Sequence, residues 1–209
     1  MVETKNNYPA DLNIDYPEKS DRLTTFFRIF TVIPILIILG LLVSGTYESH
    51  SEQGWRYMYH AAGFVVVPTV LMILFRKKYP RWWFDWNLAL TKFATRVLSY
   101  LILLTDEYPS TDEDQAVHIE IPYPDAKNEL RRGMPLIKWF LAIPHVFVLC
   151  FLYVAVVVIT IMSWFSILFT GNYPKGLFEF MVGVMRWSLR VSAYAVLLTT
   201  DKYPPFSLH

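Results

Sequence analysis

The sequence predicts an all-α integral membrane protein, a tandem repeat of apolar transmembrane helices and mixed amphipathic helices. Of its 209 residues 54% are hydrophobic and only 18% are charged, so the chain is far more hydrophobic than an ordinary soluble domain. Its uncharged segments approach the roughly 20 residues that a membrane-spanning helix needs. Seven of the 13 prolines follow a tyrosine, and these Tyr-Pro pairs recur at matching places in two halves of the chain.

The two halves align over a block of constant spacing. Tyr79, Phe84, Arg96 and Tyr100 match Tyr173, Phe178, Arg190 and Tyr194, and further upstream Pro34 matches Pro144. The polar loop from Ser44 to Arg56 has no counterpart in the second half. We therefore predict a first repeat, residues 1–110, with two membrane spans and an interfacial helix, and a second repeat, residues 111–209, with one long membrane helix and an interfacial helix.

Three apolar segments are the candidate spans: Phe26 to Val43, Tyr57 to Phe75 and Leu136 to Phe169. The third is longer than one straight span requires, because a helix rises about 1.5 Å per residue and the hydrocarbon layer is about 30 Å thick. It is either one tilted helix or a hairpin within the membrane. We favour the single helix, because a hairpin in hydrocarbon leaves backbone groups unpaired unless protein surrounds it.

Each repeat begins with a lead in which polar and apolar residues alternate. The leads are Leu12 to Asp15 and Val117 to Ile121. A period of two predicts short strands, which can pair with each other.

The charged residues outside the apolar segments predict the topology. Four basic residues follow the second candidate span, namely Arg76, Lys77, Lys78 and Arg81. By the positive-inside rule this end is cytoplasmic, which places the N-terminus inside as well. The first 25 residues are polar and acidic, unlike a cleavable signal peptide. We therefore expect an uncleaved, multi-pass membrane protein.

The segments Trp82 to Leu104 and Lys175 to Leu198 are predicted to be mixed helices, in which charged residues recur in register. Asp85, Lys92 and Arg96 match Glu179, Arg186 and Arg190. Spacings of seven and eleven residues return to nearly the same helix face, so each helix carries one acid and two bases in a narrow stripe. Such a helix either lies at the interface, with its bases reaching the headgroups, or spans the membrane with its charges facing partners. We favour the interface.

Tryptophans support the interfacial placement, because indole rings collect at the headgroup level. Trp82, Trp83 and Trp86 lie in the first mixed helix and Trp187 in the second. With the charged stripes they form our predicted site for anionic lipid headgroups or a partner subunit. The alternative is that these residues only hold the helices at a fixed depth.

The sequence contains no catalytic motif, and we predict neither an enzyme, nor a metal site, nor a cofactor. His60 and His145 lie in or beside apolar segments, so axial haem ligation is the one cofactor alternative. An acidic run, Asp106 to Asp114, reads as a solvated loop rather than a cation site. The formal net charge of +1 implies no attraction to nucleic acid, and the single Cys150 excludes an internal disulfide.

Several motifs of the second half resemble a known family. They are Ile143-Pro144-His145, then Leu168 to Phe180, Val184 to Trp187, and Thr200 to Phe206. These residues resemble the bacterial membrane protein family called domain of unknown function 4389, densely over residues 117–209 and more weakly over residues 12–110. The resemblance implies a small, repeated, helical membrane protein and brings no established activity.

The function expected from the sequence is that of a non-catalytic accessory or scaffold subunit of a larger membrane protein complex, in contact with anionic lipid. The alternative is a lipid-binding or lipid-transport protein, in which Lys92, Arg96, Arg186 and Arg190 hold the headgroups. A third hypothesis is a homo-oligomeric pore, which needs a mixed helix to span the membrane.

Overall fold

The computed structural model describes residues 8–43, 46–50, 56–60 and 66–209, with the side chains of residues 43, 46–50 and 56–60 left out. The described chain forms the strands β1 (Asp11–Ile14), β2 (Thr46–His50), β3 (Arg56–His60) and β4 (Val117–Glu120). Its helices are α1 (Arg22–Val43), α2 (Val66–Arg76), α3 (Arg81–Leu101), α4 (Met134–Thr170) and α5 (Lys175–Ala195). The fold is mostly helical, as predicted.

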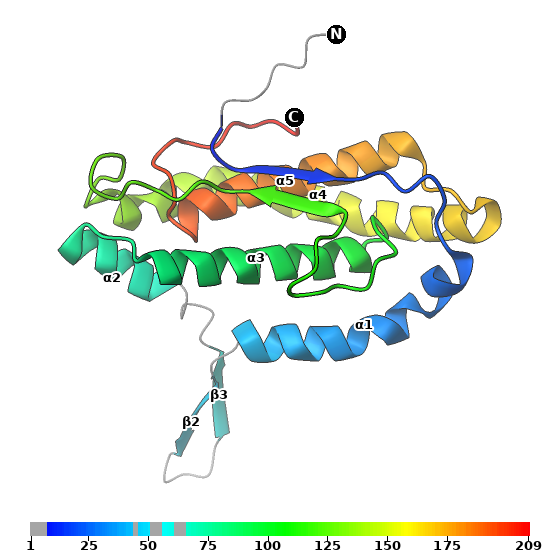
Figure 1. The fold of residues 1–209 in the computed structure, drawn as a ribbon, viewed down its shortest axis with the longest axis horizontal. Helices are drawn as coiled ribbons and strands as arrows, with labels where there is room; N and C mark the ends of the chain where they lie inside the picture. Colours follow the sequence, from blue (N-terminus) through cyan, green and yellow to red (C-terminus); the bar gives the residue numbers. More distant parts are fainter. Residues whose placement is uncertain (1–7, 44–45, 51–55, 61–65) are drawn as a thin grey trace.

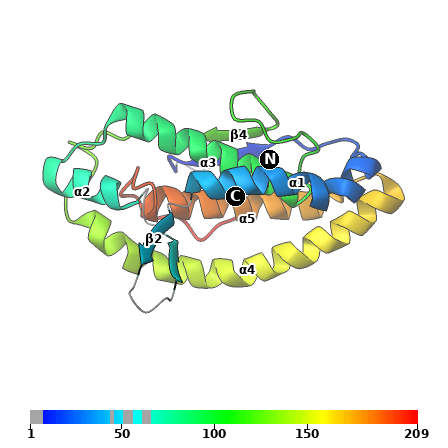
Figure 2. The same cartoon turned by 90° about the horizontal axis from the view of Figure 1, so that it is seen from below.

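The long helices lie side by side along one axis (Figure 1). The small sheet of β1 and β4 covers one side of the helical layer, and α1 lies on the opposite side. Seen from below, α4 forms a continuous arc beside α1 and runs in the opposite direction (Figure 2). Helix α5 lies between the sheet and the outer helices and has 13 buried residues, so the second mixed helix is the centre of the core.

The helix boundaries follow from local chemistry. Pro80 and Pro174 immediately precede α3 and α5, where their missing N–H groups cost nothing because the first turn has no partner for them. Gly171 ends α4 in the left-handed conformation, with φ of 77°, and its N–H bonds back to the carbonyl of Ile167 at 2.8 Å. The two mixed helices are therefore found within three residues of their predicted ends.

Two of the three apolar segments form the long helix that the sequence predicts. Helix α1 covers the first segment, and α4 covers the third as one unbroken helix of 37 residues, as favoured from the sequence. The expectation of one long helix from Tyr57 to Phe75 is wrong. Strand β3 occupies residues 56–60, and α2 begins only at Val66 and has 11 residues, about 16 Å. Among the described residues, two helices are long and apolar enough to cross a membrane, α1 and α4.

The predicted strand leads pair with each other in an antiparallel sheet. Leu12 lies opposite Ile119 and Ile14 opposite Val117, and all four side chains are buried. The side chains between them point outward, as an alternating pattern requires. Strands β2 and β3 form a second antiparallel pair, from Thr46 opposite His60 to His50 opposite Arg56. Part of the predicted polar loop, residues 44–45 and 51–55, lies outside the described residues.

The two repeats exchange contacts through a tyrosine that follows each lead. Tyr16, after the first lead, donates its hydroxyl to the carbonyl of Tyr173 in the second repeat. Tyr123, after the second lead, donates to the carbonyl of Tyr79 in the first repeat. The rings repeat the exchange, because Tyr16 packs edge-on against Phe178 and Tyr123 against Phe84, with centroids 5.0 and 5.3 Å apart. The Tyr-Pro turns at Tyr79 and Tyr173 are thus each held by the other repeat.

The turn after α4 gives a prediction. Gly171 has φ of 77°, whereas Lys77, which aligns with it in the first repeat, holds φ of 49° with a side chain present. We expect Gly171→Ala to lower the free energy of unfolding by about 1 kcal/mol, because a Cβ is strained in this region. Gly133→Ala is the matched control, since Gly133 has φ of −84° and open space around it.

Thermal and denaturant unfolding of both variants in one detergent measures the difference. Equal stability of Gly171→Ala and Gly133→Ala would contradict the requirement for a left-handed residue at the end of α4.

Candidate functional site

The charged stripe of α3 is split between solvent and the protein interior. Asp85 is exposed and lies 3.7 Å from Arg81 one turn earlier, a weak surface pair. Lys92 is half-buried. Arg96 is buried and donates from Nη1 to the carbonyl of Ser110 at 2.8 Å. This base therefore holds the loop that follows its own helix.

The bases of the second stripe, on α5, contact the first strand and the C-terminal tail. Arg186 lies 3.1 Å from the carboxylate of Asp11 and donates to the carbonyl of Leu12 at 2.9 Å. Arg190 is 2% exposed, lies 3.5 Å from the same carboxylate and donates to the carbonyl of His209 at 2.5 Å. Burial lowers the pKa of Arg190, and Asp11 opposes that shift. Glu179 is exposed at the start of α5.

The four tryptophans of the predicted site do not share one environment. Trp82 and Trp86 are exposed on the first turns of α3. Trp83 stands between them in the sequence, but its side chain is buried and donates its indole N–H to Thr69 of α2 at 2.8 Å. Trp187 is buried and donates to Nδ1 of His145 at 3.1 Å. In the whole predicted site, which is the two charged stripes and these tryptophans, four side chains are exposed: Trp82, Trp86, Asp85 and Glu179.

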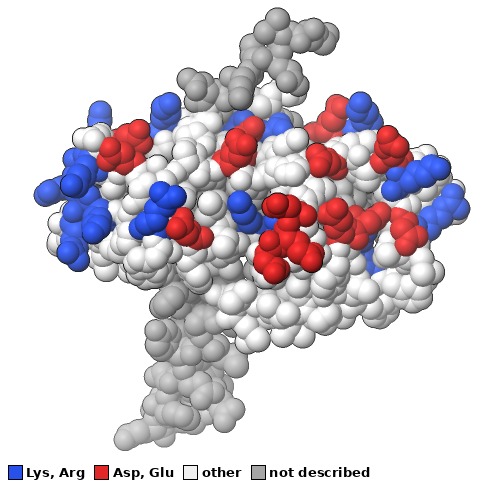
Figure 3. Space-filling view, viewed as in Figure 1, with Lys and Arg blue, Asp and Glu red and all other residues white. Residues whose placement is uncertain are grey.

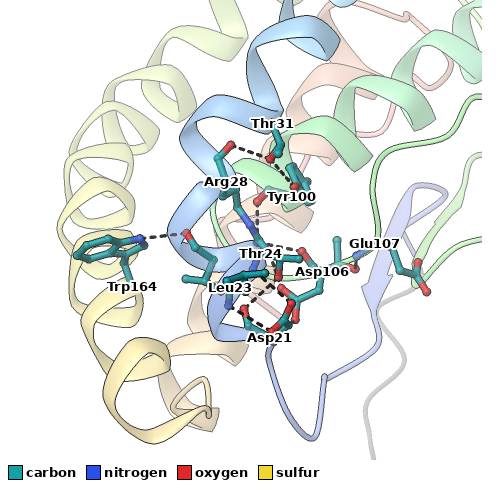
Figure 4. Close-up of polar contacts among 11 residues, drawn as sticks. Asp21, Leu23, Thr24, Arg28, Thr31, Tyr100, Asp106, Glu107 and Trp164 are labelled. Carbon is teal, nitrogen blue, oxygen red and sulfur yellow. Dashed lines mark hydrogen bonds and ion pairs between the residues drawn. The ribbon is translucent and has the colours of Figure 1, made fainter.

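A buried cationic cluster that the sequence reasoning missed joins α1 to the end of α3 (Figure 4). The guanidinium of Arg28 donates to the carbonyls of Tyr100 and Thr105 at 2.9 and 3.0 Å, and it pairs with the carboxylate of Asp106. It also lies over the Tyr100 ring, 4.4 Å from the centroid. Asp106 accepts a further bond from the backbone N–H of Asp21 at 2.8 Å.

The second repeat contains the same cluster with a lysine in place of the arginine. Lys138 of α4 donates to the carbonyl of Thr200 at 2.8 Å, lies 2.7 Å from Asp201 and sits 5.2 Å from the centre of the Tyr194 ring. Asp201 accepts the backbone N–H of Arg131 at 2.8 Å. We call these two sites the α1 clamp (Arg28, Tyr100, Asp106) and the α4 clamp (Lys138, Tyr194, Asp201).

The repeat alignment contains the signal for the clamps. Arg28 and Lys138 stand six residues before Pro34 and Pro144, the matching prolines of the two apolar helices. A charged residue at the same place in two long apolar segments indicates a buried partner, because an isolated charge there is costly. Of the two carboxylates, Asp106 was expected in a solvated loop and Asp201 carried no such expectation, since nothing local connects either of them to a cation so far away in the sequence.

Burial raises the pKa of tyrosines that hold the turns. Desolvation raises the pKa of Tyr79 to about 12, and its hydroxyl donates to the carbonyl of Leu197 in the other repeat at 3.0 Å. At the start of α1, Asp21 accepts the backbone N–H groups of Leu23 and Thr24, which lower its pKa. The tyrosine therefore stays neutral, and the aspartate stays ionised as a cap, throughout the physiological pH range.

The C-terminal tail packs on α4 around His145. The imidazole is fully buried and stacks on Phe206, with ring centroids 3.9 Å apart, and Tyr203 and Trp187 lie beside it. Three of the motifs that carry the family resemblance thus meet in one aromatic cluster. His60, the other histidine considered as a haem ligand, lies in β3, where the structure describes only the backbone.

An apolar groove of about 490 Å³ lies between α1 and α4. Its floor comes from the end of α3, and its walls include Ile29, Val157 and Thr160. A neighbouring groove of about 550 Å³ among α3, α4 and α5 shares Ile102 and Val156 with it and has hydroxyl groups on its walls. Both volumes fall in the range of small-molecule sites. Within the described residues, no three His, Cys, Asp or Glu side chains are placed to hold a metal ion.

These features define a class of protein: a mostly helical tandem repeat with a small sheet, internal cation–carboxylate clamps and two long, outward-facing apolar helices. Residues 134–207, which are α4, α5 and the tail, match the model of the family described as Domain of unknown function (DUF4389). This confirms the resemblance in the second repeat. No curated protein and no solved structure matches the chain.

The equivalence of the two clamps gives a prediction. We expect Arg28→Leu to lower the free energy of unfolding by about 3 kcal/mol, because it leaves a partly buried carboxylate and two carbonyls without their cation. Arg28→Lys is expected to cost under about 1 kcal/mol, since a lysine fills this position in the α4 clamp. Arg132→Leu, at an exposed position, controls for loss of one positive charge.

Denaturant unfolding in a fixed detergent measures all three variants. Equal losses for Arg28→Leu and Arg28→Lys would show that the clamp depends on the guanidinium fork rather than on a positive charge.

Proposed function

We propose that this protein is a non-catalytic accessory or scaffold subunit of a larger membrane protein complex. The observation that carries the proposal is the exposure of its two most apolar helices. Within their most apolar 18-residue windows, only 22% of α1 and 11% of α4 is buried inside the protein. A core helix of a soluble protein is mostly buried, so these helices require a covering outside the chain.

The composition of the outward surface supports a membrane setting. After Arg28, α1 has no charged residue, and after Lys138, α4 has none over its remaining 32 residues. The exposed side chains are large and apolar, such as Phe30 at 68%, Phe147 at 65% and Phe169 at 78% exposure. Both cations are held by internal carboxylates, so neither places a charge on the outer surface.

The wider expectations stay part of this proposal. They are a bacterial inner membrane, a multi-pass chain with a cytoplasmic N-terminus, and contact with anionic lipid. For that contact the exposed tryptophans of α3 and the half-buried Lys92 are better placed than Arg190, because the donors of Arg190 contact Asp11 and the tail.

The groove between α1 and α4 favours a second candidate function, the binding of a lipid. Its walls are almost wholly apolar, and it is open along the exposed faces of the two helices. A site of this shape accommodates an acyl chain without any buried polar group losing a partner.

The accessory-subunit proposal predicts the composition of the protein's native surroundings. Extraction from the native membrane into detergent-free polymer discs, followed by mass spectrometry, is expected to recover at least one integral membrane protein in a fixed ratio. Recovery of the protein alone, in discs that retain other complexes intact, would contradict the proposal. A lone protein enriched in one lipid would support the lipid-binding candidate instead.

The groove is tested by filling it. Thr160 is half-buried on the groove wall, whereas Val154 is 65% exposed on α4 and lies outside the groove. We expect Thr160→Trp to reduce co-purified lipid several-fold in native mass spectrometry, because the indole occupies the volume of the chain. Val154→Trp is the matched control and is expected to retain lipid. Equal lipid content in both variants would rule out the groove as the site.

A further inference from the structure

We propose that α1 and α4 lie flat in one leaflet of the bilayer instead of crossing it, so that the partner of the α1/α4 face is the hydrocarbon of a single leaflet. This inference rests on the membrane location in the proposed function and replaces its multi-pass topology. The α1/α4 face is defined as the exposed side chains of α1 and α4.

The distribution of charge is the first argument. Lysine, arginine, aspartate and glutamate side chains lie along the whole length of the molecule on the sheet side, whereas the margin formed by α1 after Arg28 is uncharged (Figure 3). If the long axis were the membrane normal, the charged residues halfway along that axis would lie in hydrocarbon. Each would cost about 2.5 to 3.5 kcal/mol on insertion scales. With the axis in the membrane plane, all of them face water.

The β1–β4 sheet is the second argument. It runs along the same axis as the long helices, beside α5 (Figure 1). It has two strands, and four of its polar side chains are exposed to the outside: Asp11, Asn13, His118 and Glu120. Open sheet edges do not occur against lipid in the hydrocarbon layer, because their N–H and C=O groups find no partner there. A bilayer crossed along the long axis would contain this sheet, whereas a leaflet under the α1/α4 face leaves it in water.

Helix length is the third argument. The uncharged part of α4 after Lys138 has 32 residues, about 48 Å. To fit a hydrocarbon layer of about 30 Å, it would have to tilt by about 50°, beyond the usual limit of about 40°. In the plane of a leaflet there is no such limit, and Figure 2 shows α4 as a continuous arc that extends along the molecule past the end of α1.

Charges at the two ends of the α1/α4 face complement a lipid surface. Arg76, Lys78 and Arg81 lie where α2 meets α3, at one end of the molecule, and Arg22 and Lys175 begin α1 and α5 at the other. All five are exposed. Basic residues that border an apolar surface bind the headgroups around it, as in other in-plane helices.

Single-cysteine labelling tests the orientation in the full-length protein. Cys150 is the only cysteine, so Cys150→Ser gives a cysteine-free background. Lys127→Cys and Lys175→Cys then place one exposed thiol before α4 and one after it. Glu120→Cys adds a thiol on the sheet. A membrane-impermeant maleimide is applied to sealed right-side-out and inside-out vesicles, and the thermal unfolding of each variant checks its fold.

We expect all three thiols to react in the same vesicle orientation. Reaction of Lys127→Cys and Lys175→Cys in opposite orientations would show that α4 crosses the membrane and would overturn the inference while leaving the membrane location intact. Recovery of the protein in the soluble fraction would instead contradict the proposed function itself.

A second measurement identifies what covers the face. Cys150 is exposed on α4, and a fluorophore attached to it in phosphatidylcholine–phosphatidylglycerol vesicles is expected to lose fluorescence when the lipids carry nitroxide groups on their acyl chains. No quenching would mean that a second copy covers the face, and the inference would fail. A fluorophore at Glu120→Cys, on the sheet, is the control and is expected to keep its emission.

Discussion

One buried cation in each repeat connects an apolar helix to the rest of the protein. Arg28 and Lys138 are the only charged side chains inside the long apolar runs. Each reaches a carboxylate and a carbonyl just beyond a mixed helix, and a tyrosine ring in the last turn of that helix. Since a buried charge is tolerated only with such partners, the cation fixes where the apolar helix begins relative to the end of its neighbour. The other contacts of α1 and α4 combine apolar packing, which is less directional, with hydrogen bonds such as those from Trp164 of α4 to the carbonyl of Thr25 of α1 and from Trp187 to His145.

The repeats depend on each other as much as on their own clamps. Their leads form one sheet, and the tyrosine after each lead donates to a Tyr-Pro turn of the opposite repeat. Neither repeat can satisfy these groups by itself, and the largest hydrophobic cluster contains residues of both repeats, beside a smaller cluster in each. Helix α5 is deeply buried by this arrangement, because β1 covers one side of it and α4 another. This position accounts for the burial of Arg190, whose counterpart Arg96 also holds a following loop.

The outward surface follows from the same arrangement. The polar sheet and the charged parts of α3 and α5 gather on one side (Figures 1 and 3). Beyond Arg28 and Lys138, α1 and α4 carry no charge, and their large apolar side chains are exposed within the described part of the chain. A surface divided in this way matches an interface between water and hydrocarbon. The orientation of helices in a bilayer therefore depends on where the remainder of the fold places its charges, as well as on helix length.

The sequence by itself determined the local structure: the period of two gave β1 and β4, unbroken apolarity gave α4, and Tyr-Pro pairs marked the starts of α3 and α5. It failed at residues 57–60, which were assigned to an apolar helix and form part of strand β3, because short apolar runs fit strand and helix alike. Only the tertiary structure decided which charges face water. A basic residue in a helix has the same local sequence whether its partner is a headgroup or, as for Arg28, an aspartate 78 residues away. Coulomb attraction and burial depend on distances in space, which spacing along the chain does not fix.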